Sequence, residues 1–260
     1  MDFDGDRGRS WDASSYDSLA SPMTEMARAV LDRLPLTGDE VVMDAGCGTG
    51  RVTELLLGHL PRGRVLAVDA DPDMVRIAAQ NLDRPEFAGR VEVDRVDLLR
   101  LDLDAAVDAV LSTATFHWVL DHPALFQQIY RALRPGGRLV AQCGGSGNIG
   151  ELRRIGEEVG RRDEFAEWLR DWEPPWYYAD PEETADRLQT VGFEEVSTWL
   201  QPWPVVPEDP AQYLATITHG AQVQRLPEHL RDRYVEAILD ESSAPFTVEY
   251  VRLNVDARRP

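Results

Sequence analysis

The seven residues Asp44 to Gly50, DAGCGTG, combine a carboxylate with three alternate glycines. Glycine takes positive φ values readily and carries no Cβ, so a ligand can approach its backbone closely. A short apolar run, Val41 to Met43, precedes the glycines, and apolar residues return at helical spacing from Val52 to Leu60. The pattern predicts a strand, a tight ligand-binding turn and a helix.

The spacing of the glycines excludes two phosphate-binding motifs. A dinucleotide fingerprint, G-x-G-x-x-G, would need a third glycine at the position of Arg51. The phosphate loop G-x-x-x-x-G-K-[ST] needs a lysine, and the chain contains none. An acid beside the turn would repel a pyrophosphate, whereas it can pair with an ammonium group. What remains is the pattern D-x-G-x-G-x-G, with an acid at the end of the strand.

The pattern D-x-G-x-G-x-G resembles motif I of the class I S-adenosylmethionine-dependent methyltransferases. The resemblance covers roughly residues 38 to 145. It implies that S-adenosylmethionine is the cofactor and S-adenosylhomocysteine the product. It also implies a set of cofactor contacts along the first two strand ends, namely Asp44, Ala45, Gly46, Gly48, Gly50 and Ala70.

Two further acids close the next predicted strands. Asp69 ends RVLAVD, where a carboxylate can accept hydrogen bonds from both ribose hydroxyls; the alternative role, a helix N-cap, suits Asp71 better. Asp97 ends the third strand, where it can accept from an adenine amino group, with the Leu98 amide near a ring nitrogen. Met74 either lies against the adenine through its polarizable sulfur or packs in the core.

The stretch Asp108 to Phe126, DAVLSTATFHWVLDHPALF, resembles the trans-aconitate methyltransferase group of small-molecule O-methyltransferases. His117 stands where this group usually has glutamine, and both side chains donate hydrogen bonds to a carboxylate. The resemblance implies that His117 is the catalytic, acceptor-orienting residue and that Trp118 forms a wall of the acceptor site. Thr113 replaces a common asparagine at a cofactor contact. The alternative is that His117 caps the next helix and Trp118 is a core residue.

Aromatic residues elsewhere supply further candidates. In the N-terminal segment Ser10 to Asp17, Tyr16 is a candidate for the cofactor and Trp11 for the acceptor, as parts of a lid; a tail is the alternative. Five later aromatic residues either line an acceptor pocket or pack a cap onto the core: Trp176, Tyr177, Tyr178, Trp199 and Trp203. Of these, we expect Tyr177 and Tyr178 to contact the acceptor. Three arginines are possible carboxylate partners or ordinary surface residues: Arg153, Arg154 and Arg225.

Strand and helix patterns alternate from residue 20 to about 145, which indicates βαβ units with a ligand site at the carboxyl ends of the strands. The resemblance implies an α/β, Rossmann-like doubly wound sheet of seven mostly parallel strands with an antiparallel last strand, plus a mostly helical cap. The expected division is a lid or tail at 1–18, the cofactor-binding core at 19–145, a cap insertion at 146–180, a core helix and strand at 181–200, a helical cap at 201–243 and a final core strand at 244–260.

Composition narrows the partners. A net charge of −19 and a pI near 4.6 disfavour nucleic acid, because phosphate binding needs a basic face. No apolar run approaches the ~18 residues of a membrane span, and the acidic N-terminus is unlike a signal peptide. Two cysteines and five scattered histidines form no metal motif. We expect a cytoplasmic monomer or homodimer, without metal, membrane or nucleic acid, acting on a small molecule.

The expected reaction is SN2 transfer of the sulfonium methyl to an oxygen of a small acid, trans-aconitate-like or another. A carboxylate is already ionised at pH 7 and needs no base, so catalysis would consist mainly of alignment. A hydroxyl or amine of a secondary metabolite, with His117 as base, is the alternative acceptor. Two other classes stay open: a nicotinamide oxidoreductase, which the absent third glycine disfavours, and a non-catalytic cofactor-binding partner subunit.

Overall fold

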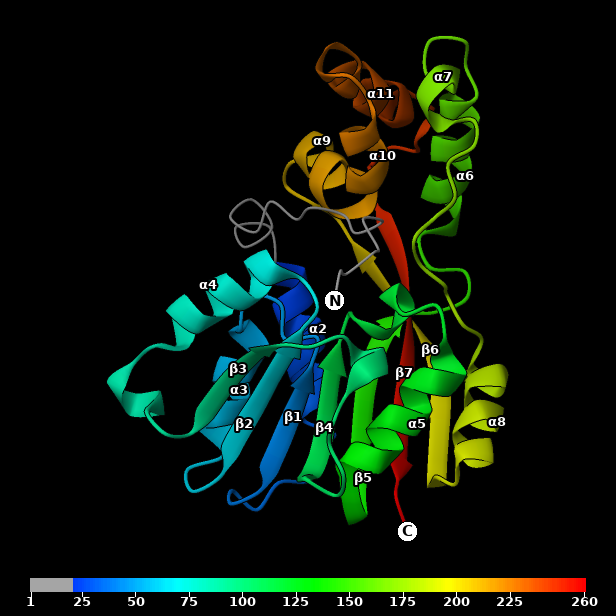
Figure 1. Cartoon of the computed structure of the whole chain (residues 1–260). Helices are drawn as coiled ribbons and strands as arrows, with labels where there is room; N and C mark the ends of the chain where they lie inside the picture. Colours follow the sequence, from blue (N-terminus) through cyan, green and yellow to red (C-terminus); the bar gives the residue numbers. More distant parts are fainter. Residues whose placement is uncertain (1–20) are drawn as a thin grey trace. The chain divides into compact units, whose positions relative to one another are not determined.

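The computed structural model describes residues 21–260, which fall into two compact units (Figure 1). The sheet unit comprises residues 21–146, 176–201 and 252–260, and the helical unit comprises residues 147–175 and 202–251. Trp11 and Tyr16 lie outside the described residues, so their predicted roles in a lid stay predictions.

Seven strands form one sheet in the order β3-β2-β1-β4-β5-β7-β6. Their bounds are β1 Val41–Ala45, β2 Arg64–Asp69, β3 Val91–Arg95, β4 Val107–Thr113, β5 Leu133–Gly144, β6 Glu194–Val205 and β7 Val248–Arg258. Strands β1 to β5 pair in parallel, and β7 runs antiparallel to β5. The predicted fold class, with mostly parallel strands and an antiparallel last strand, is confirmed.

Helices cover both faces of this sheet (Figure 1). Their bounds are α2 Ser21–Leu31, α3 Arg51–His59, α4 Pro72–Leu82, α5 His122–Ala132 and α8 Pro181–Val191, with short 3-10 helices η1 Pro85–Phe87, η2 Leu98–Arg100 and η3 Phe116–Trp118. One core contains residues of α2, α3 and α4, and the other contains residues of α5 and α8. Neighbours along a strand, such as Val42 and Met43, enter opposite cores, which explains why the central strands are apolar throughout.

An aspartate and a proline begin three of the helices at the sheet. Asp71, Asp121 and Asp180 each accept hydrogen bonds from backbone N–H groups of the first turn, and a proline occupies the first or second helical position. These caps satisfy N–H groups that the helix itself cannot pair. The predicted N-cap role of Asp71 is therefore confirmed.

Two strands end at other residues than the sequence pattern predicts. β3 ends at Arg95 instead of Asp97, because the Asp97 side chain caps η2. β6 continues to Val205 through Pro202 and Pro204, beyond the predicted end at residue 200. Because β6 is an edge strand, a proline there can point its missing N–H away from the ladder.

The helical unit contains α6 Gly150–Gly160, α7 Ala166–Leu169, α9 Pro210–Tyr213, a π-helical turn η4 Leu214–Thr218, α10 Gly220–Arg225 and α11 Glu228–Glu241. Phe165 packs edge-on against Tyr234, with ring centroids 5.3 Å apart. His219 is fully buried, and both of its ring nitrogens are hydrogen-bonded, Nδ1 to Thr218 Oγ1 and Nε2 to the carbonyl of Leu152. Burial lowers the pKa of His219 to about 4, so this histidine is a neutral part of the core.

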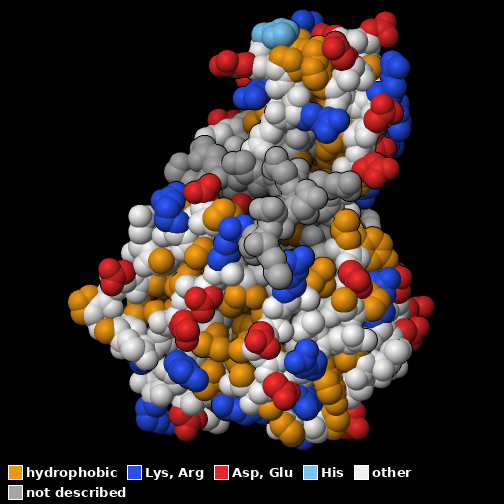
Figure 2. All heavy atoms as spheres, viewed as in Figure 1, with side chains coloured by type: hydrophobic (Ala, Val, Ile, Leu, Met, Phe, Trp, Pro, Cys, Tyr) orange, Lys and Arg blue, Asp and Glu red, His pale blue; other side chains and the backbone are white. Residues whose placement is uncertain are grey.

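The charged side chains are mixed in sign on the face of each unit that Figure 2 shows. Several are paired, as Arg154 is with Glu151 and Glu158 on α6, at 2.7 Å each. Such exposed pairs contribute little to stability. Within residues 21–260, the helices are all too short or too polar to cross a bilayer.

Candidate cofactor and acceptor site

All three glycines of the turn after β1 have positive φ, +84° at Gly46, +55° at Gly48 and +87° at Gly50. A Cβ at Gly46 would overlap the Thr115 side chain, and one at Gly50 would lie 3.0 Å from a methyl of Leu82. A Cβ at Gly48 would meet no atom of residues 21–260 within 4 Å. Gly46 and Gly50 are thus required by packing inside the protein, whereas Gly48 faces open space where a ligand can lie.

Asp69 ties this turn to the next helix. Its Oδ2 accepts from the N–H of Gly48 and its Oδ1 from the N–H of Asp71, both at 2.9 Å. Burial raises the pKa of Asp69, although these hydrogen bonds oppose the shift. A carboxylate has about four acceptor positions, more than these N–H groups use, so hydroxyl donors such as those of a ribose can also bind it.

Asp44 is fully buried beneath the turn. Thr53 Oγ1 donates to its Oδ2 at 2.6 Å, while Oδ1 has no hydrogen-bond partner among the described residues. Burial raises the pKa of Asp44 to about 7; the Thr53 hydrogen bond opposes this shift and the charge of Asp69 adds to it. A buried unpaired oxygen is costly, and a ligand ammonium, directly or through a water, would satisfy it.

Asp97 lies at the same edge of the sheet. Asp69 and Arg95 are register partners, and the N–H of Val96 donates to the carbonyl of Asp69 at 2.9 Å. The Asp97 Oδ1 accepts from the N–H of Leu99 at 2.9 Å. The neighbouring candidates are bonded or buried within the protein: Ala70 accepts through its carbonyl from Arg95 Nε, while Leu98 and Met74 are each 5% exposed. Their contacts with an adenosyl group stay predictions.

The end of β4 is joined to the glycine turn by two hydroxyls that the sequence pattern does not single out. Ser112 Oγ donates to the carbonyl of Ala45 at 2.7 Å, and Thr115 Oγ1 donates to that of Gly46 at 3.2 Å. The predicted contact residue Thr113 ends β4 and pairs with Gln142 of β5. These bonds hold η3, which follows β4, beside the turn.

His117 of η3 is 7% exposed and bonded through one ring nitrogen. The N–H of Gly144 donates to Nδ1 at 3.3 Å, and Nε2 makes no hydrogen bond with any residue of the described range. Burial lowers its pKa well below the usual value, and the charges of Arg252 and His122 act in the same direction. The ring is therefore neutral near pH 7, and because Nδ1 accepts, its proton resides on Nε2.

The contacts of His117 and Trp118 bear on their alternative roles as a helix cap and a core residue. Asp121, not His117, caps α5, so the helix-cap interpretation of His117 is wrong. Trp118 is only half-buried. It belongs to an aromatic cluster of four rings, His117, Trp118, Trp176 and Tyr178, whose neighbouring centroids lie 5.0 to 6.0 Å apart.

Tyr177 and Tyr178 face different surroundings. Tyr178 belongs to the aromatic cluster, with its ring 5.7 Å from that of His117. The Tyr177 hydroxyl donates to Glu183 of α8, and its ring packs edge-on against His122 at 5.3 Å. Adjacent residues of an extended segment point in opposite directions. The ring of Tyr178 thus lies beside that of His117, whereas Tyr177 turns its ring toward α8 and contacts His117 through its backbone N–H, which donates to the His117 carbonyl at 2.8 Å. The roles of both tyrosines as acceptor contacts stay predictions.

Part of the chain is similar to a known protein family. Residues 43–141, from β1 into β5, match the family model described as "Methyltransferase domain". This match covers less than half of the chain and supports the class I S-adenosylmethionine-dependent methyltransferases as its family. The sequence prediction of the family is confirmed, and the family implies S-adenosylmethionine as the cofactor.

Trans-aconitate 2-methyltransferase of Azoarcus sp. is 37% identical over 132 residues, which are 51% of this chain and 50% of that protein. The chain thus spans about half the length of this relative. The trans-aconitate 2-methyltransferase of Paracidovorax citrulli is 26% identical over 257 residues, covering 96% of this chain and 90% of that one. The YcgJ protein of Bacillus subtilis shares the fold, with a TM-score of 0.63 at 14% identity, covering 92% and 97% of the two chains.

The three arginines predicted as carboxylate partners are in the helical unit and have protein partners. Arg154 and Arg153 pair with glutamates of α6, and Arg225 Nε donates to the carbonyl of Trp168. A different arginine of the methyltransferase sheet is buried, Arg252 of β7, at 3% exposed. In the sequence, Arg252 stands between Val251 and Leu253 in the run VRLNV, where Asn254 is the other polar residue.

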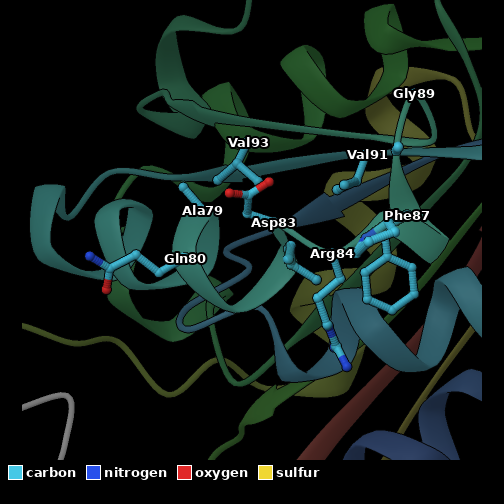
Figure 3. Close-up of a pocket in the computed structure, with 11 residues that line it drawn as sticks. Ala79, Gln80, Asp83, Arg84, Phe87, Gly89, Val91 and Val93 are labelled. Carbon is cyan, nitrogen blue, oxygen red and sulfur yellow. The ribbon is translucent and has the colours of Figure 1, made fainter.

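An open groove lies at the β3 edge of the methyltransferase sheet (Figure 3). It is lined by the last turn of α4, η1 and β3, including Ala79, Phe87, Val91 and Val93. Arg84 beside it pairs with Glu54 at 2.7 Å and lies over the ring of Phe87. None of the predicted site residues lines this groove.

Proposed function

We propose that the chain is an O-methyltransferase that transfers a methyl group from S-adenosylmethionine to a carboxylate of a small acid. The observation that carries the acceptor class is the state of His117, a neutral ring with Nδ1 occupied by the N–H of Gly144 and a proton on Nε2. The Nε2–H can donate to a carboxylate oxygen, which is an acceptor only. Relatives named trans-aconitate 2-methyltransferase support a small acid as the acceptor.

The residues after β1 and β2 fit the donor. S-Adenosylmethionine, when bound, supplies an electrophilic methyl group on a sulfonium sulfur. Asp44 offers for the ammonium group an Oδ1 that has no partner among the described residues, and Asp69 offers its remaining acceptor capacity for the ribose hydroxyls. Gly48 leaves open space for close approach to the backbone. Asp97, two residues after β3, would accept from the adenine amino group.

The acceptor side requires alignment and no general base. A carboxylate is ionised at pH 7 because its usual pKa is near 4. His117 would hold one of its oxygens, and the rings of Trp118 and Tyr178 would exclude water around the reacting pair. Alignment of this kind can supply up to ~7 to 11 kcal/mol of barrier reduction.

The contacts of His117 weigh against the alternative acceptors. A base for a hydroxyl or amine needs a free lone pair on the ring, and the one lone pair of this neutral tautomer accepts from Gly144. A non-catalytic cofactor-binding subunit would not need a donor held beside the glycine turn. Of three buried histidines, His122 and His219 have both nitrogens bonded within the protein, whereas His117 has one.

The test is methyl transfer from labelled S-adenosylmethionine to a panel of small acids, followed across pH. We expect kcat/KM to be nearly flat above the pKa of the acid. Calorimetry should show binding of S-adenosylhomocysteine. A tenfold rise in kcat/KM between pH 6 and 8 would identify a base and contradict the carboxylate proposal, and absence of S-adenosylhomocysteine binding would contradict the cofactor.

A further inference from the structure

Arg252 and His117 flank the same residue of the sheet. Arg252 is the register partner of Gly144 in the antiparallel β5–β7 pair, and the N–H of Gly144 donates to His117 Nδ1. Gly144 is the last residue of β5, so both side chains lie at its carboxyl end, the edge at which ligands of such sheets bind. The positive charge of Arg252 is near enough to lower the pKa of both His117 and Cys143, against the larger effect of burial at Cys143.

A chain of hydrogen bonds between amide side chains positions Arg252. Its Nε donates to Gln142 Oε1 at 3.5 Å, and Gln142 Nε2 donates to Asn254 Oδ1 at 2.9 Å. Asn254 is in turn bonded to Gln201 at 3.2 Å and accepts from Arg33 Nη1 at 2.9 Å. Gln142 and Asn254 are each no more than 2% exposed, so this network fixes the guanidinium within a region of low dielectric.

A guanidinium and a neutral N–H donor at one corner form a receptor for anions. Arginine presents a planar fork that binds carboxylates through two hydrogen bonds, and it stays charged at any physiological pH. A guanidinium fork on the reacting carboxylate would engage both of its oxygens, whereas the single N–H of His117 leaves one oxygen free to attack the methyl group. The two donors are therefore suited to two different groups of one acceptor.

We infer that Arg252 is a specificity-determining residue: it binds an anionic group of the acceptor that does not receive the methyl, while His117 donates to the carboxylate that does. The inference rests on the proposed function, since it concerns the acceptor of that reaction. If Arg252 has this role, the site selects acceptors by the presence of a second negative charge, rather than by their size or apolar area.

The experiment compares small diacids of four to six carbons with their monoamides, in which one carboxylate is replaced by a neutral amide. Wild type, Arg252→Gln and Arg252→Lys are measured for kcat/KM and, as complexes with S-adenosylhomocysteine, for calorimetric binding. The matched control is Arg258→Gln, on the same strand but partly exposed and paired with Glu195 at 3.0 Å. We expect Arg252→Gln to lose about 30-fold or more for the preferred diacid. It should change little for the monoamide.

Arg252→Lys should restore part of the preference, and Arg258→Gln should leave it unchanged. Affinity for S-adenosylhomocysteine within threefold of wild type reports that a variant is folded. Diacids that bind in an Arg252-dependent way but are never methylated would refute the proposed function and keep the inference. Methylation with equal efficiency of diacid and monoamide, or an Arg252→Gln variant with the wild-type preference, would overturn the inference and keep the function.

Discussion

The glycine turn and the acceptor corner lie at the same edge of one sheet and are built in opposite ways. The turn is a run of seven consecutive residues whose geometry is set by the backbone, with three positive φ values. The acceptor corner is assembled from η3, the end of β5, the aromatic segment 176–178 and β7, which are remote in sequence. The residue types of the donor turn are therefore encoded within one short segment, although Asp69 and Thr115 support it, whereas the acceptor corner depends on pairing between segments that are remote in sequence.

The strongest test of this contrast is Gly46→Ala. The added Cβ would overlap Thr115, and the φ of +84° at Gly46 disfavours any side chain there. We therefore expect the free energy of unfolding to fall by about 2 to 5 kcal/mol and binding of S-adenosylhomocysteine to become unmeasurable. Denaturant unfolding and calorimetry give both quantities. Gly58→Ala, at an exposed position in the last turn of α3, should instead be neutral or stabilising. A fully stable Gly46→Ala would show that packing does not fix the turn.

Asp44→Asn tests whether burial controls the charge beneath the turn. Because burial raises the pKa of Asp44 from 3.8 to about 7, the native state holds a proton that the unfolded chain releases above pH 4. Wild type should lose stability as pH rises through about 4 to 7, by at most about 4 kcal/mol, and then level off. The asparagine variant should lack this loss and bind S-adenosylhomocysteine more weakly.

The control for that profile is Glu40, where the effect has the opposite sign. Burial raises its pKa, but hydrogen bonds from Thr37 and from the N–H of Gly38 outweigh this and lower it to about 2. Its contribution to stability is present above the unfolded pKa and is lost as pH falls toward 2. The difference in the free energy of unfolding between wild type and Asp44→Asn should change between pH 4 and 7. A constant difference would contradict the prediction that buried Asp44 binds a proton in the native state.

His117 variants test the acceptor corner without touching the turn. His117→Ala removes the Nε2–H donor, and we expect a loss of about 10- to 100-fold in kcat/KM with unchanged S-adenosylhomocysteine affinity. His117→Gln keeps an N–H donor and an oxygen that can accept from Gly144, so it should stay within a few-fold of wild type. If glutamine is as impaired as alanine across pH, the ring is acting as more than a donor.

The smallest expected effect belongs to Tyr177→Phe. The change removes one hydrogen bond to Glu183, whose other oxygen still accepts from Arg187. The free energy of unfolding should therefore fall by about 0.5 to 1 kcal/mol. Acceptor kinetics should not change, whereas Tyr178→Ala should raise KM for the acceptor. A changed KM for the acceptor in Tyr177→Phe would indicate that the Tyr177 hydroxyl contacts the acceptor.

The core of the fold follows from contiguous patterns. The strand RVLAVD is found at Arg64–Asp69, and Asp71 caps α4 because local hydrogen bonds decide a helix start. The longer extent of β6 does not follow, since Pro202 and Pro204 are tolerated only because the strand is at the sheet edge. The burial of Arg252 does not follow either, since β7 carries other charged residues and the partner of Arg252, Gly144, is set by pairing across more than 100 residues of chain.

The sequence by itself determined the glycine turn, the acids at the strand ends and the family, because these depend on backbone freedom and on chemistry within short segments. Only the tertiary structure decided which lone pair of His117 is occupied, which of Tyr177 and Tyr178 lies beside it, and that Arg252 is buried at the same corner. The physical reason is that protonation, orientation and burial are set by neighbours that the sequence places far away.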